Sequence, residues 1–271
     1  MNKHMDGTLN MDERTKILNE YYEDGNLENE RFSKDKYHQI EYITTKKYIE
    51  KYLKKGDRIL ELGAGAGAYS LYYANLGYHV DAIEFVEGNL NMLKSKITDN
   101  MNINAMQGDA LDLSRYEDNT FDVTLVLGPL YHLYSENDKR KAIEEAIRVT
   151  KKGGFIYFAY LTNDSVFISY CLKKHHLLDK GLFDSNYKLI DNPKEVFSVF
   201  YIDEYEKIMK DFDVEYISNV ATDGVSGAVR EYVNELTDEE FNVWLDYHLS
   251  TCERKELQGY SNHMLYICRK N

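Results

Sequence analysis

Apolar and polar positions follow two different spacings through the middle of the chain. Short apolar runs with the length of buried strands alternate with amphipathic stretches that have the spacing of helices. The runs lie at residues 59–62, 78–83, 103–106, 121–128 and 155–161, and the amphipathic stretches lie at 69–76, 87–99 and 139–149. This alternation predicts an α/β protein with a doubly wound, mostly parallel sheet.

The segments on either side of this alternation follow other patterns. Apolar stripes predict helices at 11–22 and 35–53, before the first strand. The last third contains a predicted helix at 203–212, a strand at 214–217, a helix with a capping box behind Thr237 and a final strand at 264–268. We therefore expect a frayed N-terminus at 1–10, a helical segment at 11–55 and a main domain at 56–271, with insertions at about 162–202 and 220–261.

A glycine-rich turn follows the first predicted strand directly. Three glycines alternate with alanines from Gly63 to Gly67, and a predicted helix comes next. Glycine lets a ligand approach the backbone N–H groups at the start of a helix. Glu84 ends the next strand, about 20 residues after Gly63, where a carboxylate accepts hydrogen bonds from ribose hydroxyls. The strand–turn–helix unit therefore predicts a nucleotide-type cofactor.

Two classes of cofactor use such a turn. The looser pattern Gly63-x-Gly65-x-x-Ala68 is compatible with a nicotinamide dinucleotide. Glu61 favours S-adenosylmethionine (SAM) instead. Its carboxylate precedes the first glycine, where it suits the ammonium and sulfonium charges of SAM and would repel a pyrophosphate.

The full spacing Glu61-x-Gly63-x-Gly65-x-Gly67 resembles motif I of the class I SAM-dependent methyltransferases. The resemblance implies a Rossmann-like seven-stranded sheet with an antiparallel last strand and an N-terminal helical lid. It places Glu84 on the ribose, the Gly108-Asp109-Ala110 turn on the adenine, and the strand that ends at Leu127 beside the methyl group. The cofactor-binding residues it implies are Glu61, Gly63, Ala64, Gly65, Gly67, Glu84, Phe85, Gly108, Asp109, Ala110, Leu127 and Gly128.

The candidate chemistry follows the strand that ends near Gly128. The Gly-Pro-Leu-Tyr-His-Leu sequence there resembles bacterial small-molecule and uncharacterised members of the family, and it lacks the Asp/Asn-Pro-Pro-Tyr/Phe motif of nucleic-acid amino methylation. His132 is the candidate general base and Tyr131 the candidate positioning residue. Activity should fall as the pH drops through the titration of this imidazole. The alternative is that His132 packs below the site without chemistry.

Four residues in the N-terminal segment are candidate lid residues, because such a segment often folds over the cofactor in small-molecule methyltransferases. They are Tyr21, Tyr22, Arg31 and His38. Ordinary packing is the alternative for each of them. The acceptor itself is not named by the sequence, since its pocket would be built from the irregular insertions.

Charge and cysteine content narrow the range of partners. A formal net charge of −13 makes nucleic acid an unfavourable substrate. The three cysteines form no regular framework, which fits a reducing cytoplasm, and the chain has no apolar run long enough for a membrane span. The histidines and carboxylates lack metal-ligand spacing.

We therefore expect a cytoplasmic SAM-dependent methyltransferase, monomer or homodimer, that methylates an O or N nucleophile of a small molecule without a metal. The alternatives are a protein or RNA methyltransferase, a NAD-dependent oxidoreductase and a SAM-binding regulator without catalysis.

Overall fold

A computed structural model describes residues 11–22, 26–192 and 196–271, so the predicted frayed segment at 1–10 lies outside the described residues. Within the described ranges, a seven-stranded sheet has the order β3-β2-β1-β4-β5-β7-β6. The strands are β1 (Arg58–Leu62), β2 (His79–Glu84), β3 (Ile103–Gln107), β4 (Phe121–Val126), β5 (Thr150–Leu161), β6 (Val214–Ala221) and β7 (His263–Lys270). β7 runs antiparallel to β5 and β6, while β1 to β5 pair in parallel. The predicted fold class is confirmed.

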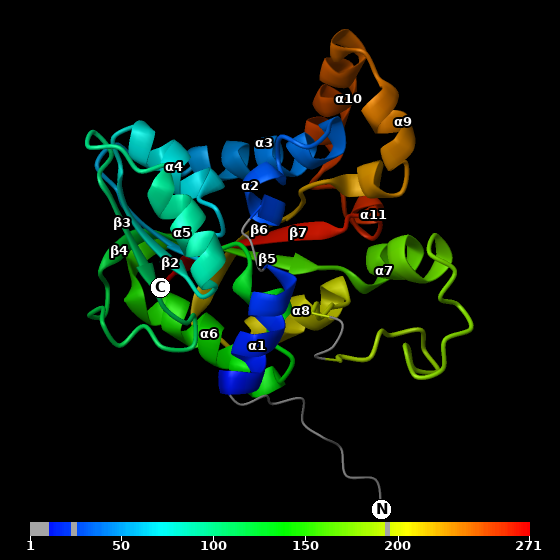
Figure 1. Ribbon diagram of the computed structural model, residues 1–271, viewed down its shortest axis with the longest axis horizontal. Helices are drawn as coiled ribbons and strands as arrows, with labels where there is room; N and C mark the ends of the chain where they lie inside the picture. Colours follow the sequence, from blue (N-terminus) through cyan, green and yellow to red (C-terminus); the bar gives the residue numbers. More distant parts are fainter. Residues whose placement is uncertain (1–10, 23–25, 193–195) are drawn as a thin grey trace, which may run out of the picture.

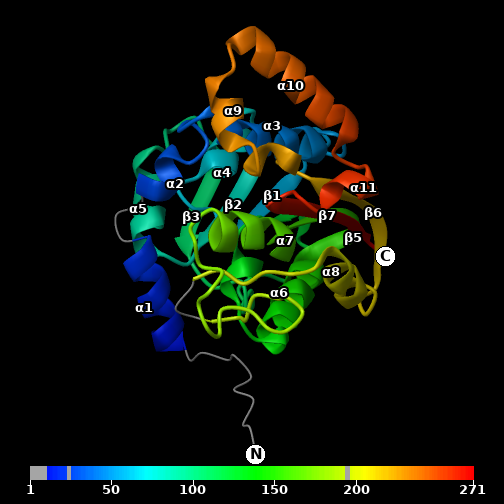
Figure 2. The same ribbon diagram turned by 90° about the vertical axis from the view of Figure 1, so that its right-hand side faces the viewer.

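Helices cover both faces of the sheet (Figures 1 and 2). Helices α3 (Lys36–Glu50) and α4 (Ala68–Asn75) lie on one face, and α6 (Glu136–Val149) and α8 (Ile202–Met209) lie on the other. Helix α5 (Glu87–Ser95) contacts β2 and β3. The glycine turn between β1 and α4 therefore opens at the carboxyl edge of the parallel strands, where α/β sheets bind ligands.

The N-terminal helices reach this same edge. Helix α1 (Met11–Tyr21) packs through Leu18 and the following Tyr22 against Val86 and Val196. The short helix α2 (Asn26–Glu30) contacts α5, and Asp35 caps α3 by accepting from the His38 N–H at 3.0 Å.

Two irregular segments complete the fold. After β5 come α7 (Asn163–Val166) and a π-helical turn, η2 (Phe167–Leu172). After β6 come η4 (Gly224–Gly227), α9 (Arg230–Glu235), α10 (Asp238–Thr251) and α11 (Lys255–Gln258). Thr237 and Glu240 form the predicted capping box, and α9 and α10 pack on α3 through Val233 and Phe241. Figure 1 shows these two helices beyond α3, away from the sheet.

Strand β6 is longer than the sequence predicts. It continues past residue 217 to Ala221, into the expected second insertion. The sequence does not predict this part of the strand, because it contains polar residues where a buried strand is expected to be apolar. In the structure these polar residues are nevertheless buried. Asn219 is one of them, and its side-chain amide donates to the Tyr160 hydroxyl at 2.8 Å.

Candidate cofactor and acceptor site

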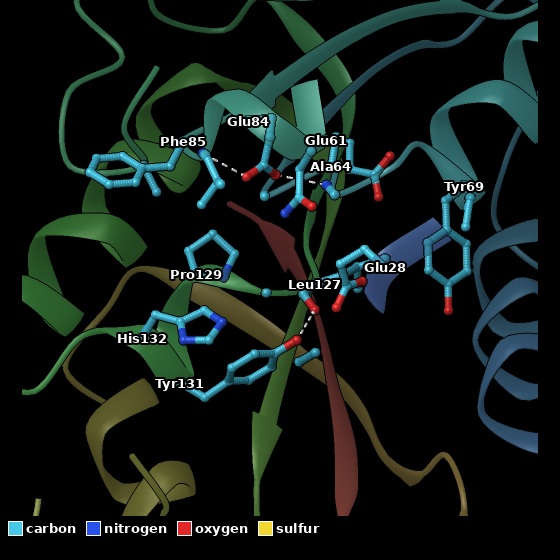
Figure 3. A pocket seen from close by; sticks show the side chains of 18 of the residues that line it. Glu28, Glu61, Ala64, Tyr69, Glu84, Phe85, Leu127, Pro129, Tyr131 and His132 are labelled. Atoms are coloured by element: carbon cyan, nitrogen blue, oxygen red, sulfur yellow. Dashed lines mark hydrogen bonds between the residues drawn. The ribbon is translucent and has the colours of Figure 1, made fainter. Parts of the chain in front are cut away.

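A cavity lies over the carboxyl ends of the first four strands. Its walls come from the turns after β1, β2, β3 and β4 and from the N-terminal helices, and the start of β7 closes one side. Figure 3 shows Glu84 and Glu61 on one side of this space, with His132 and Tyr131 across from them. The structure thus brings together most of the predicted site residues.

The glycine turn has the backbone that the sequence predicts. Gly63, Gly65 and Gly67 have φ angles of +71°, +55° and +89°, in the left-handed region that side chains disfavour. Gly63 and Ala64 donate their N–H groups to the Ile83 carbonyl at 2.8 and 3.1 Å, which ties the turn to β2. Gly63, Ala64 and Gly65 line the cavity. Gly67 instead allows close packing, because a Cβ there would collide with Leu93.

Glu84 holds the turn from the end of β2. Its Oε2 accepts from the Gly65 N–H at 2.7 Å and its Oε1 accepts from the Val86 N–H at 2.8 Å. Burial raises the pKa of this carboxyl. Beside it, the buried Asn89 Oδ1 lines the cavity without a hydrogen-bond partner among the described residues. A ligand with hydroxyl donors, such as a ribose, fits this pair of acceptors.

Glu61 places a second carboxylate beneath the glycine turn. The side chain is 2% exposed and accepts a hydrogen bond from the Ser70 hydroxyl. Burial raises its pKa to about 8. A buried carboxylate with no described cation beside it fits a positively charged ligand, which agrees with the ammonium and sulfonium groups of SAM.

Asp109 has a partner that the sequence did not suggest. Gly108, Asp109 and Ala110 line the cavity as predicted, but the Asp109 carboxylate forms an ion pair with Arg14 of α1. The Arg14 guanidinium also lies 4.6 Å from the centre of the Phe85 ring. Arg14 therefore occupies the space between Phe85 and Asp109, where the adenine is expected. The sequence offers no signal for this contact, because it depends on how α1 docks.

The turn η1 (Pro129–His132) carries the two candidate catalytic residues. The Tyr131 hydroxyl donates to the Leu127 carbonyl at 2.9 Å, and burial raises the pKa of Tyr131 to about 12. Both nitrogens of His132 are engaged. Nδ1 lies 3.0 Å from the Val196 carbonyl, which accepts its proton, so Nε2 accepts from the Tyr22 hydroxyl at 3.1 Å.

Burial also lowers the pKa of His132 to about 4. The imidazole is then neutral through the range in which a histidine ordinarily titrates. If His132 acts as the base, the expected fall in activity would therefore come near pH 4, below the ordinary histidine range.

The four candidate lid residues lie in different places. Tyr22 and Arg31 line the cavity. Tyr21 instead packs edge-on against Phe197, and the His38 Nδ1 bonds the Asp35 carboxylate at 2.6 Å. Neither of these two belongs to the lining of the cavity among the described residues.

A polar cluster on the far side of the cavity was missed by the sequence analysis. Arg31 meets Glu41 of α3 and His263 of β7, and His263 meets Asp223 after β6. These residues are separated by up to 232 positions, so only the folded chain brings them together.

Residues 60–158 match the family model described as a methyltransferase domain. Over 114 residues the chain is 36% identical to demethylmenaquinone methyltransferase of Paenarthrobacter aurescens, a match that covers 42% of each protein. The chain therefore spans less than half the length of this curated relative.

Two solved structures share the fold. One is a SAM-dependent methyltransferase from Methanosarcina mazei, with a TM-score of 0.54 and 19% identity over 82% of this chain and 96% of that one. The other is a SAM-dependent methyltransferase from Thermotoga maritima, described as a possible histamine N-methyltransferase, with a TM-score of 0.55 and 16% identity over 96% of this chain and 99% of that one. The predicted methyltransferase domain and its SAM-binding fold are confirmed for this part of the chain.

Two negative findings hold for the described part of the chain. None of its helices is both long and apolar enough to cross a bilayer. The same residues contain no group of three or more His, Cys, Asp or Glu side chains that could hold a metal ion.

Proposed function

We propose that the whole chain is a SAM-dependent methyltransferase that acts on an O or N nucleophile of a small molecule. The observation that carries this proposal is the buried Glu61 carboxylate beside the glycine turn, at the edge of a methyltransferase-type sheet. The cationic methionyl end of SAM would favour the ionised form of this buried acid and pair with it, whereas a pyrophosphate would oppose its ionisation. This preference argues against the nicotinamide alternative.

The residues around the glycine turn would each bind a different part of the cofactor. Glu61 would face its cationic end, Glu84 and Asn89 the ribose, and Asp109 with the Ala110 N–H the adenine. Bound SAM supplies an electrophilic methyl group whose departure leaves a neutral thioether. The protein's task is then to align the acceptor and to exclude water.

Three observations support a small acceptor. The cavity is roofed by α1 and α2, and the Glu28 carboxylate of α2 reaches within 3.3 Å of a Cβ built on Gly65. The net charge of −13 disfavours a polyanionic RNA. The bacterial relative is named for a small-molecule acceptor, which points in the same direction.

The N-terminal helices serve as the lid in this proposal. Tyr22 and Arg31 are the lid residues whose side chains line the cavity. His132 holds the lid in place, because its Nε2 accepts a hydrogen bond from the Tyr22 hydroxyl. Tyr131 positions the acceptor beside the carboxyl end of β4. His132 is thus a positioning residue, because burial lowers its pKa to about 4 and makes it a weak base.

Thermal unfolding with three ligands separates the alternatives. SAM and its demethylated product, S-adenosylhomocysteine (SAH), should raise the melting temperature, and NAD should leave it unchanged. SAH formation with a panel of small metabolites then distinguishes an enzyme from a SAM-binding regulator. A melting temperature raised by NAD alone would overturn the proposal.

A further inference from the structure

His263 lies in the half of the cavity that the cofactor residues do not use. It begins β7 opposite Leu161 of β5, and because β7 is antiparallel its start lies at the carboxyl edge of the sheet. In the strand order, β7 lies beyond β4 and β5, on the opposite side from β2 and β3, which lead to Glu84 and Asp109. With SAM on the glycine turn, His263 faces the remaining space, where an acceptor would lie.

A buried carboxylate fixes the orientation of this imidazole. The Asp223 Oδ2 lies 2.9 Å from His263 Nδ1, and the Asp223 side chain is fully buried. Asp223 also accepts from the hydroxyls of Tyr37 and Ser261 and from the Asn262 N–H, at 2.7 to 3.0 Å. Burial of Asp223 opposes its ionisation, but the hydrogen bonds from His263 and Ser261 outweigh burial and lower the pKa of this carboxyl. The ionised carboxylate holds the ring proton on Nδ1 and leaves the Nε2 lone pair toward the cavity.

A guanidinium faces that lone pair. Arg31 Nη2 lies 3.1 Å from His263 Nε2, and Glu41 holds the same nitrogen at 2.7 and 3.0 Å. Arg31 and His263 both line the cavity, with side chains 20% and 13% exposed. An acceptor oxygen inserted at this contact would meet a base and a fixed positive charge together. The guanidinium would stabilise a developing oxyanion and would repel an amine that arrives as an ammonium ion.

Aromatic side chains line the wall next to this polar contact. Phe32 and Tyr69 meet edge to face at 5.5 Å between ring centres, and Tyr131 lies on the same cavity. Such walls suit a flat ring. A phenol, with a pKa of about 10, yields its proton to an imidazole far more readily than an aliphatic alcohol does.

We infer that His263, oriented by Asp223, is the general base for an acceptor with a phenolic or enolic hydroxyl, and that Arg31 stabilises its oxyanion. The hydroxyl proton moves to His263 Nε2 and an oxygen lone pair forms the new O–CH₃ bond. The electrons of the broken C–S bond remain on the sulfur of the departing SAH. This inference rests on the proposed methyltransferase function and names its substrate class.

The charged groups around His263 come from several elements. Glu41 of α3 places Oε2 3.5 Å from Nδ1, and Arg31 faces Nε2. Asp223 is the closest anion, Tyr37 faces it, and Glu28 of α2 lies 3.7 Å from Arg31. Because several charged groups surround His263, a pH profile alone would not isolate its titration. The test therefore compares an acceptor that still carries its hydroxyl proton with one that is already ionised.

The decisive variant is His263→Asn, with His79→Asn as the matched control. His79 lies at the opposite, amino end of β2 and its side chain is 44% exposed. Transfer of labelled methyl from SAM is measured to phenol, to aniline and benzylamine, and to 4-nitrophenol, which is largely ionised in mildly alkaline buffer. We expect transfer to the phenols in preference to the amines. His263→Asn should lower the rate with phenol by about 10²–10⁴-fold and that with 4-nitrophenol far less, because the latter has no proton to remove.

Asp223→Asn should also lower the rate with phenol more than the rate with 4-nitrophenol, but its loss with phenol should be smaller than that of His263→Asn. The melting temperature of this variant reports whether the protein still folds without the buried carboxylate. Equal losses with phenol and 4-nitrophenol in His263→Asn would overturn the role of the base. Methyl transfer to amines alone, or to none of the phenols while SAM still binds by calorimetry, would overturn the acceptor class. Failure of the parent protein to bind SAM would instead reject the proposed function itself.

Discussion

Arg14 and Asp109 form an ion pair across the part of the cavity in which the adenine of SAM is expected. The Arg14 side chain is 8% exposed and lies against the Phe85 ring, so its guanidinium occupies the space that a purine would need. The N-terminal helix and the cofactor therefore compete for Asp109.

Removal of this side chain should favour the ligand. We expect Arg14→Ala to tighten SAH binding by about tenfold, or ~1.4 kcal/mol, because Asp109 is then available to the adenine amine. The ligand-free protein should lose stability, since the variant leaves a buried carboxylate without its cation. Calorimetry with SAH checks the affinity, and Lys16→Ala on the exposed side of α1 is the control. Weaker SAH binding in Arg14→Ala would show that Arg14 belongs to the bound state.

Glu84 should carry part of the affinity for SAM. We expect Glu84→Gln to weaken SAM binding by about 1–3 kcal/mol, the usual loss of a hydrogen bond to a charged group. The two carboxylate oxygens of Glu84 also accept hydrogen bonds from the N–H groups of Gly65 and Val86. The side chain of Gln has only one acceptor oxygen, so it cannot keep both bonds. Equilibrium dialysis with labelled SAM measures the change. An affinity equal to that of the parent would remove Glu84 from the ribose site.

Glu61 should make SAM binding depend on pH. Its pKa of about 8 in the ligand-free protein means that the carboxyl is protonated at neutral pH. A bound cation favours the carboxylate, so binding releases a proton, and affinity should rise by up to about tenfold per pH unit until it levels off above pH 8. Titrations in buffers of different ionisation enthalpy detect the released proton, and Glu61→Gln should flatten the profile. A parent protein with no pH dependence between pH 6 and pH 8 would contradict this role.

The fold and the cofactor half of the site were predictable because their signals are local. One strand–turn–helix–strand unit contains all of these signals within a short stretch of sequence. They are the apolar run before Gly63, the glycines that follow it, and Glu84 at the end of the next strand. Strand β6 was underestimated because its buried Asn219 and Ser218 read as polar, and their hydrogen-bond partners lie on other elements.

The proposed acceptor side of the cavity was not predictable, because the signals for it are not local in the sequence. Asp223 lies near the start of the second insertion and His263 just after its end, and neither has a neighbour in sequence that suggests a pair. Arg14 depends on how α1 docks on the turn after β3. His132 was found from the sequence, but its depressed pKa and its bond to Tyr22 come from burial that only the folded chain defines.

The glycine turn offers the most direct test of the central claim that this cavity holds SAM. Gly65 has φ +55°, and a Cβ there would point into the cavity toward Glu28. Gly65→Val should abolish cofactor binding and leave the protein folded, while Gly259→Ala, with open space at its Cβ, should bind normally. The measurement is isothermal calorimetry of the parent and both variants with SAH and with NAD. We expect SAH binding by the parent and by Gly259→Ala, none by Gly65→Val, and no binding of NAD. Undiminished SAH affinity in a folded Gly65→Val protein, or binding of NAD in place of SAH, would contradict it.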